Sequence, residues 1–105
     1  MKKYLIIGYG WLGKALAEEL KSDELKIWAS SSDANKLIEI EANGFFSIPL
    51  TKTNQVLCWK EIPGWHFDKV IITLPPFEGV LESLKNLLNA LSFAQLIFTS
   101  STGVY

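Results

Sequence analysis

Three glycines at a fixed spacing are the residues in this chain with the clearest chemical use. They lie in the run Gly8-Tyr9-Gly10-Trp11-Leu12-Gly13, between a short apolar run and a segment with helical periodicity. In this context the first glycine permits a tight turn, the second lets the backbone approach a pyrophosphate, and the third lets the helix pack closely on the strand. The amides of Trp11 and Leu12 would then point toward the phosphates from the open end of the helix. The motif predicts dinucleotide binding.

The alternative interpretation is a glycine-rich turn that only links a strand to a helix. Dinucleotide binding is favoured because a strand precedes the turn, a helix follows it, and further elements continue in the same alternation. A phosphate-binding loop of the Walker type is excluded, since neither Gly-Lys-Ser nor Gly-Lys-Thr follows the glycines.

The end of the second expected strand indicates which dinucleotide is bound. It reads Trp28-Ala29-Ser30-Ser31-Ser32, with no carboxylate before Asp33. An acidic side chain here would bond the ribose hydroxyls and favour NAD. Ser30 and Ser31 could instead bond a 2′-phosphate, with Lys36 supplying positive charge, or they could only form the turn and cap the next helix. The missing acid favours NADP, with NAD as the alternative.

The elements that position these residues follow from the spacing of the apolar side chains. We expect strands at 4–7, 25–29, 45–48, 70–74 and 96–99, and helices at 11–21 and 80–91. A further helix is expected between Ser32, as its N-cap, and Gly44, just past its end. The segment 49–67 has no sustained period and is expected to be loop with a short helix. Alternating strands and helices predict an α/β fold of the Rossmann type in three layers, with about five parallel strands in the order 3-2-1-4-5.

Composition limits the possible partners and compartments. The 105 residues suit one domain, and a net charge of −1 lacks the positive surface of a nucleic-acid binder. Cys58 is the single cysteine, so we expect no internal disulfide and no metal site. The apolar runs fall short of the roughly 18 residues that a membrane span needs. We therefore expect a cytoplasmic protein that binds neither nucleic acid nor membrane.

Three stretches of the chain resemble a known enzyme family. They are Ile6–Gly13, Thr73-Leu74-Pro75-Pro76 and Phe98-Thr99-Ser100-Ser101-Thr102-Gly103-Val104-Tyr105. Together they resemble the extended and atypical short-chain dehydrogenase/reductases, most closely the NAD-dependent epimerase/dehydratase group. The last stretch is the most specific, because Ser-Ser-x-x-Val-Tyr after the fifth strand is a signature of that group. The Gly-x-Gly-x-x-Gly spacing departs from the Gly-x-x-Gly-x-x-Gly of typical extended members and indicates the atypical branch.

The resemblance implies roles for particular residues. Ser101 would hydrogen-bond the substrate oxygen beside a Tyr-x-x-x-Lys pair, and Leu74 and Pro75 would lie where the cofactor crosses the edge of the sheet. No Tyr-x-x-x-Lys occurs in this chain, because Tyr105 is its last residue and the other tyrosines lack a lysine four positions later. Without the resemblance, Ser101 is a polar strand end and Pro75 a strand terminator.

The resemblance therefore implies that residues 1–105 form the NAD(P)-binding, N-terminal part of a longer oxidoreductase, epimerase or dehydratase, inactive alone. The alternative is a non-catalytic module that senses a dinucleotide or has a regulatory role. The 6-phosphogluconate and hydroxyacid dehydrogenases share the opening glycines, but the Ser-Ser-Thr-Gly-Val-Tyr ending disfavours them. The fifth strand, apolar at Leu96, Ile97 and Phe98, would be an uncovered sheet edge, so we also expect a homo-oligomer through this edge or the helix beside it.

Overall fold

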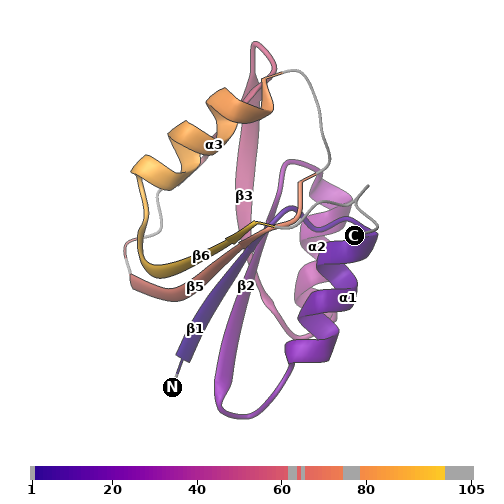
Figure 1. Cartoon of the computed structure of the whole chain (residues 1–105). Helices are drawn as coiled ribbons and strands as arrows, with labels where there is room; N and C mark the ends of the chain where they lie inside the picture. The colour runs from indigo at the N-terminus through magenta and orange to yellow at the C-terminus, as the bar shows by residue number, and fades with distance from the viewer. Residues whose placement is uncertain (1, 62–63, 65, 75–78, 99–105) are drawn as a thin grey trace.

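The computed structural model describes residues 2–61, 64, 66–74 and 79–98, which form a Rossmann-like α/β fold (Figure 1). Its strands are β1 (Lys2–Ile7), β2 (Leu25–Ser31), β3 (Phe46–Thr53), β4 (Val56–Trp59), β5 (His66–Ile72) and β6 (Ser92–Phe98). Its helices are α1 (Trp11–Leu20), α2 (Ala34–Ala42) and α3 (Val80–Asn89). None of these described helices has the length and apolar character needed to cross a bilayer.

The strands form one curled sheet in the order β4-β3-β2-β1-β5-β6. All neighbours are parallel except β3 and β4, which are antiparallel. The five parallel strands β3-β2-β1-β5-β6 reproduce the expected 3-2-1-4-5 order. The sixth strand, β4, was not expected from the sequence.

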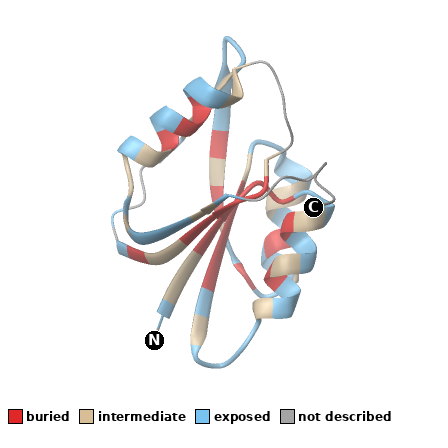
Figure 2. Ribbon diagram, viewed as in Figure 1, coloured by how far each residue is buried: buried red, intermediate tan, exposed pale blue. Residues whose placement is uncertain are grey.

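Helices cover both faces of the sheet, and each face has its own core. On one face α1 and α2 enclose the buried side chains of Ile6, Tyr9, Ala17, Ile27, Ala29, Ile40, Phe45 and Ile71. On the other face α3 packs over Leu5, Ile7, Trp28, Ile48, Leu50, Leu57, Phe67, Val70 and Ile72. Burial is greatest in the central strands (Figure 2), as expected for parallel strands with apolar side chains on both faces.

The expectation of loop and a short helix in 49–67 was wrong for its first part, and also for its last two residues, which belong to β5. β3 continues to Thr53 and returns as β4 through a two-residue turn at Asn54 and Gln55. Both turn residues have positive φ, 50° and 66°, as in the mirror-image turns that match the twist of a hairpin. α3 packs on β4, where the Leu57 amide donates to Ser83 Oγ at 2.8 Å, and this contact stabilises the hairpin.

The N-cap of α2 is Asp33 and not Ser32 as expected. The Asp33 side chain accepts a hydrogen bond from the Asn35 amide at 2.9 Å, and α2 begins at Ala34. The Ser31 hydroxyl accepts a hydrogen bond from the Asp33 amide at 3.1 Å, and this bond links the end of β2 to the N-cap of α2. Asp33 fills the cap because it stands immediately before the first helical residue, where a side-chain oxygen can reach the free amides.

Candidate functional site

The glycine turn lies at the point where the strand order of the sheet reverses. β1 pairs with β2 on one side and with β5 on the other. From β1 the chain first builds β2 and β3 outward in one direction, and later β5 and β6 in the other. In open α/β sheets, ligands bind outside the carboxyl ends of the strands at such a reversal. Residues 8–13 directly follow the carboxyl end of β1.

Gly8 is required by the backbone conformation of the turn. Its φ is +99°, in the left-handed region that side chains disfavour. A Cβ at this position would lie 2.9 Å from Leu74 Cδ2 and 3.3 Å from the Leu74 amide nitrogen. The Gly8 amide donates to the Ser30 carbonyl at 3.3 Å, which ties the turn to the end of β2. Gly8 thus brings the turn close to the ends of β2 and β5.

Gly13 is required by packing within the turn. A Cβ on Gly13 would lie 2.2 Å from the Gly8 carbonyl oxygen and 2.9 Å from Thr73 Oγ1. The first turn of α1 is therefore in direct contact with the loop that precedes it, as expected for the third glycine of the motif.

Gly10 differs from both, because no described residue occupies the space beside it. Within the described part of the chain no heavy atom lies within 4 Å of an added Cβ, and Gly10 is exposed. It is the N-cap of α1 and provides no side-chain cap. The first hydrogen bond of the helix runs from the Lys14 amide to the Gly10 carbonyl at 2.9 Å, so helix geometry leaves the amides of Trp11, Leu12 and Gly13 without an acceptor inside α1. Open space therefore lies beside a group of main-chain donors.

Thr73, directly after β5, holds the turn in place, and the sequence analysis missed this role. It is 3% exposed, and its Oγ1 lies 2.6 Å from the Gly8 carbonyl oxygen and 3.2 Å from that of Ile7. Its amide also donates to the Ile7 carbonyl at 3.0 Å. A hydroxyl that ends an otherwise apolar strand beside the reversal point is the sequence signal that could have indicated it. Thr73 positions the turn and is too buried to bind a ligand itself.

The two aromatic residues of the turn point in different directions. Tyr9 is 3% exposed and packs in the α1–α2 core, where its hydroxyl accepts a hydrogen bond from Asn43 Nδ2 at 2.9 Å. Trp11 is 74% exposed at the start of α1. Tyr9 therefore anchors the turn to the end of α2, whereas the Trp11 indole is available to a ligand.

The two serines predicted to bind the cofactor are in different environments. Ser30 is fully buried, and its hydroxyl donates to the Ile6 carbonyl at 3.4 Å. Ser31 is partly exposed at the end of β2. Near the start of α2, Lys36 lies 4.0 Å from Glu39, and Lys14 of α1 contacts the same carboxylate at 3.4 Å. Of the two serines, Ser31 is the one at the surface.

The remaining predicted residues lie around the turn or outside the described part of the chain. Leu12 is half-buried in the first turn of α1. Leu74, also half-buried, packs on the α3-side core and contacts the turn. Pro75 and Ser101 lie outside the described residues, so their predicted roles stay predictions.

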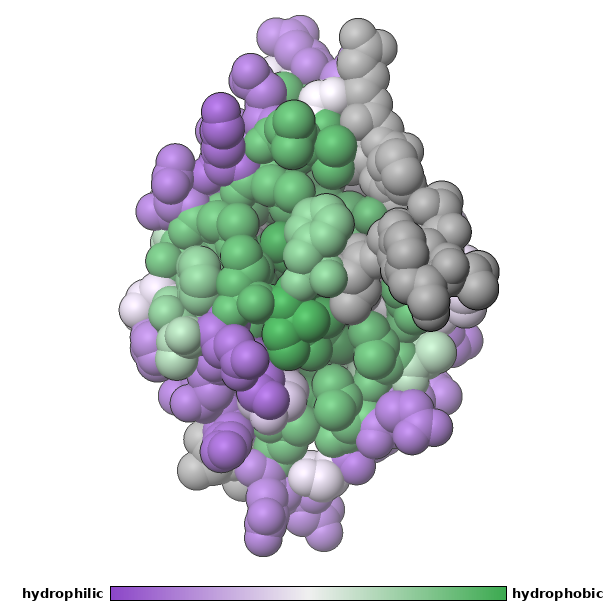
Figure 3. Space-filling model, in the orientation of Figure 1, coloured by the Kyte–Doolittle hydropathy of each residue, from purple (hydrophilic) through white to green (hydrophobic). Residues whose placement is uncertain are grey.

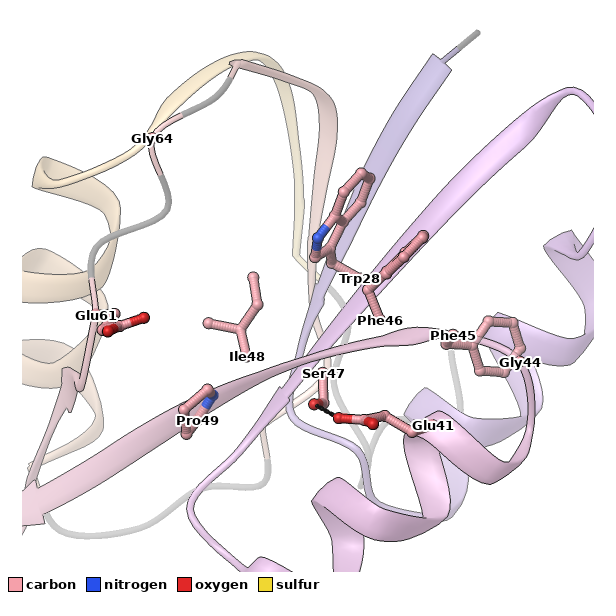
Figure 4. Close-up of a pocket in the computed structure, with 10 residues that line it drawn as sticks. All are labelled: Trp28, Glu41, Gly44, Phe45, Phe46, Ser47, Ile48, Pro49, Glu61 and Gly64. Carbon is pink, nitrogen blue, oxygen red and sulfur yellow. Dashed lines mark hydrogen bonds between the residues drawn. The ribbon is translucent and has the colours of Figure 1, made fainter.

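A cavity of about 660 Å³ lies elsewhere, along the first half of β3 (Figure 4). Its walls include the rings of Trp28 and Phe46, stacked with centroids 4.9 Å apart. Two carboxylates also line this cavity, those of Glu41 and Glu61. The Glu41 carboxylate accepts a hydrogen bond from the Ser47 hydroxyl. None of its described lining residues belongs to the glycine turn, and two carboxylates disfavour a phosphate ligand. We therefore place the candidate site in the open crevice at the turn.

Comparison with known proteins yields distant relatives. The chain is 29% identical over 116 aligned residues to Protein YeeZ of Escherichia coli strain K12, and equally to Protein YeeZ of E. coli O157:H7. It is distantly homologous to YeeZ. The alignment covers the whole chain but only 42% of the length of each of these relatives. No family model matches the chain, and no solved structure matches it either.

Proposed function

We propose that this chain binds a dinucleotide at the glycine turn, with NADP preferred over NAD. The observation that carries the proposal is the space beside Gly10, which no described residue fills, next to amides that have no acceptor inside α1 and at the reversal point of the sheet. A linking turn with no ligand has no need of a glycine at this position, because its φ of −84° is accessible to any residue.

In this proposal the main chain binds the pyrophosphate. The amides of Trp11 and Leu12 donate to phosphate oxygens, and the missing Cβ of Gly10 allows close approach. The N-terminal end of α1 adds a partial positive charge that stabilises an adjacent anion by typically about 0.3–1 kcal/mol. Gly8, Gly13 and Thr73 hold the loop in this shape and do not themselves touch the ligand.

The preference for NADP rests on the residues after β2. The strand ends at Ser31 without a carboxylate, and the nearest acid, Asp33, is engaged in capping α2. Lys14 and Lys36 lie in the first turns of α1 and α2 and contact the same carboxylate, Glu39. We propose that Ser31 and these two lysines receive the 2′-phosphate, with Glu39 holding the lysines in place.

We further propose that the chain is the cofactor-binding part of a longer oxidoreductase, epimerase or dehydratase of the short-chain dehydrogenase type. The stretch from Phe98 to Tyr105 supports this by its resemblance to that family, and Ser101 is the residue proposed to contact substrate. When bound, the dinucleotide would donate or accept a hydride, and this chain's own residues bind and orient it. The greater length of the YeeZ relatives is compatible with further residues that bind substrate.

Calorimetric titration of the chain with NADP and NAD in parallel tests this proposal. We expect both to bind, and NADP to bind more tightly. The variant Lys36→Ala should weaken NADP and leave NAD unchanged, because only NADP carries the 2′-phosphate. If neither dinucleotide binds to a folded chain at millimolar concentration, the proposal is wrong. If NAD binds more tightly, the proposed 2′-phosphate contacts are wrong while the glycine turn keeps its role.

A further inference from the structure

The cavity along β3 exists because β4 is shorter than the strand it pairs with. β4 pairs with β3 only from Leu50 to Thr53, and just beyond this pairing the Lys60 amide donates to the Pro49 carbonyl at 3.3 Å. The cavity of about 660 Å³ lies beside the first half of β3, between the end of α2 and the segment that follows β4 (Figure 4). This volume is typical of pockets that hold a small molecule.

One wall of the cavity is aromatic. The Phe46 ring stacks on Trp28 with an interplanar angle of 25°, and Trp28 meets Phe67 edge to face with centroids 5.6 Å apart. Trp28 and Phe67 are buried, whereas Phe46 is 49% exposed. The two buried rings therefore hold the Phe46 ring in place while about half of its surface stays accessible. The face of such a ring carries partial negative charge and attracts cations.

The charge that lines the cavity is negative and uncompensated. Glu41 comes from α2 and Glu61 from the segment after β4, and the Ser47 hydroxyl donates to Glu41 Oε2, which holds that carboxylate beside β3 (Figure 4). The described lining residues include no Lys, Arg or His. The ion pairs among the described residues involve neither Glu41 nor Glu61. Charge thus distinguishes this cavity from the broad apolar area in Figure 3, which hydrophilic side chains only border.

A cation of the chain itself already binds to the neighbouring ring. Lys21 Nζ lies 5.3 Å from the centroid of Phe45 and donates to the Asn43 carbonyl at 2.8 Å. Phe45 also lines the cavity, but Lys21 does not. The ammonium of Lys21 is thus held by the end of α2, and the two carboxylates of the cavity remain available to a cation from solution.

We propose that this cavity binds a small organic cation, an ammonium group carried on an apolar body. The ammonium group lies between the Phe46 ring and the two carboxylates, and the apolar body packs on Ile48. Cation–π attraction and the negative lining favour this ligand over a neutral molecule of the same shape. The inference does not depend on dinucleotide binding, because the cavity and the glycine turn share no described residue.

Choline and its neutral carbon isostere, in which a tert-butyl group replaces the trimethylammonium group, test the selection by charge. In ¹⁵N–¹H spectra of the chain at constant ionic strength, choline should shift the amides of residues 44–48 and the indole of Trp28. Choline should bind roughly 2- to 30-fold more tightly than the isostere, the range that cation–π attraction provides. No shift at these residues with choline at tens of millimolar, or equal affinity for the two compounds, overturns the proposal.

Two substitutions at exposed side chains separate the ring from the charge. Glu61→Gln should weaken choline binding roughly two- to fivefold and leave the isostere unchanged. Phe46→Leu keeps an apolar side chain and should weaken choline more than the isostere. Glu18→Gln is the matched control, because Glu18 is an exposed carboxylate on α1 that does not line the cavity. A folded Glu61→Gln chain that binds choline as tightly as wild type means that the carboxylates do not hold the ammonium, and the proposal fails.

Discussion

The substitution Gly10→Ala should separate ligand binding from folding. The backbone angles of Gly10, φ −84° and ψ −165°, are accessible to alanine, and no heavy atom of the residues that the structure describes lies within 4 Å of the new methyl group. Restricting the unfolded chain stabilises by about 0.4–1 kcal/mol, and replacing glycine by alanine at an N-cap destabilises by a similar amount. We therefore expect the free energy of unfolding to change by less than about 1 kcal/mol.

The same methyl group should strongly reduce dinucleotide affinity. It fills the space through which the pyrophosphate would reach the amides of Trp11 and Leu12. Loss of one hydrogen bond to a charged group costs about 1.5–3 kcal/mol, which corresponds to a roughly 10- to 150-fold larger dissociation constant. Isothermal titration calorimetry gives the affinity, and thermal denaturation of the same samples gives the stability.

Gly64→Ala is the matched control for this experiment. Gly64 lies before the amino end of β5, whereas the turn lies at the carboxyl ends of the strands, and among the described residues an added Cβ there also has no heavy atom within 4 Å. It should change neither stability nor affinity. If Gly10→Ala binds NADP as tightly as wild type and remains folded, the pyrophosphate does not approach Gly10, and the reasoning is refuted.

The other predictions concern the residues that hold the turn. Gly13→Ala should lower the free energy of unfolding by about 1–3 kcal/mol or more, because its methyl group overlaps a backbone carbonyl; urea denaturation measures this, and an unchanged midpoint would contradict the packing described. Thr73→Val should cost about 1–3 kcal/mol in the same assay, since it leaves the Gly8 carbonyl without its donor. Tyr9→Phe should cost about 0.5–1.5 kcal/mol through the lost Asn43 bond, and no change would show that this bond contributes nothing. Trp11→Ala should leave stability nearly unchanged and weaken NADP binding, whereas equal affinity would exclude a ligand contact.

The five parallel strands and their order could be predicted because their signals are local and strong. Apolar runs of four or five residues alternate with helical periods, and right-handed crossovers then leave few topologies. β4 could not be predicted in this way. It has four residues, its turn at Asn54 and Gln55 contains no glycine, and its stability comes from α3, which lies more than twenty residues further along the chain.

The candidate site was predicted in part. The glycine spacing indicated a tight turn at Gly8 and close packing at Gly13, and the contacts at these two residues agree with that, whereas the approach of a pyrophosphate to Gly10 stays a prediction. The burial of Ser30 could not be read from its position at a strand end, because the sequence does not say which way a hydroxyl points. The contact of Thr73 with the turn depends on two strands separated by more than sixty residues.

The central claim is that main-chain amides at the start of α1 hold the pyrophosphate, and amide chemical shifts during an NADP titration test it most directly. The largest changes in a ¹⁵N–¹H spectrum should fall on residues 10–13, with smaller ones near Ser31. Inorganic pyrophosphate should move residues 10–13 and leave Ser31 unchanged. Changes concentrated around the Trp28–Phe46 cavity, with residues 10–13 unmoved at saturation, would contradict the claim.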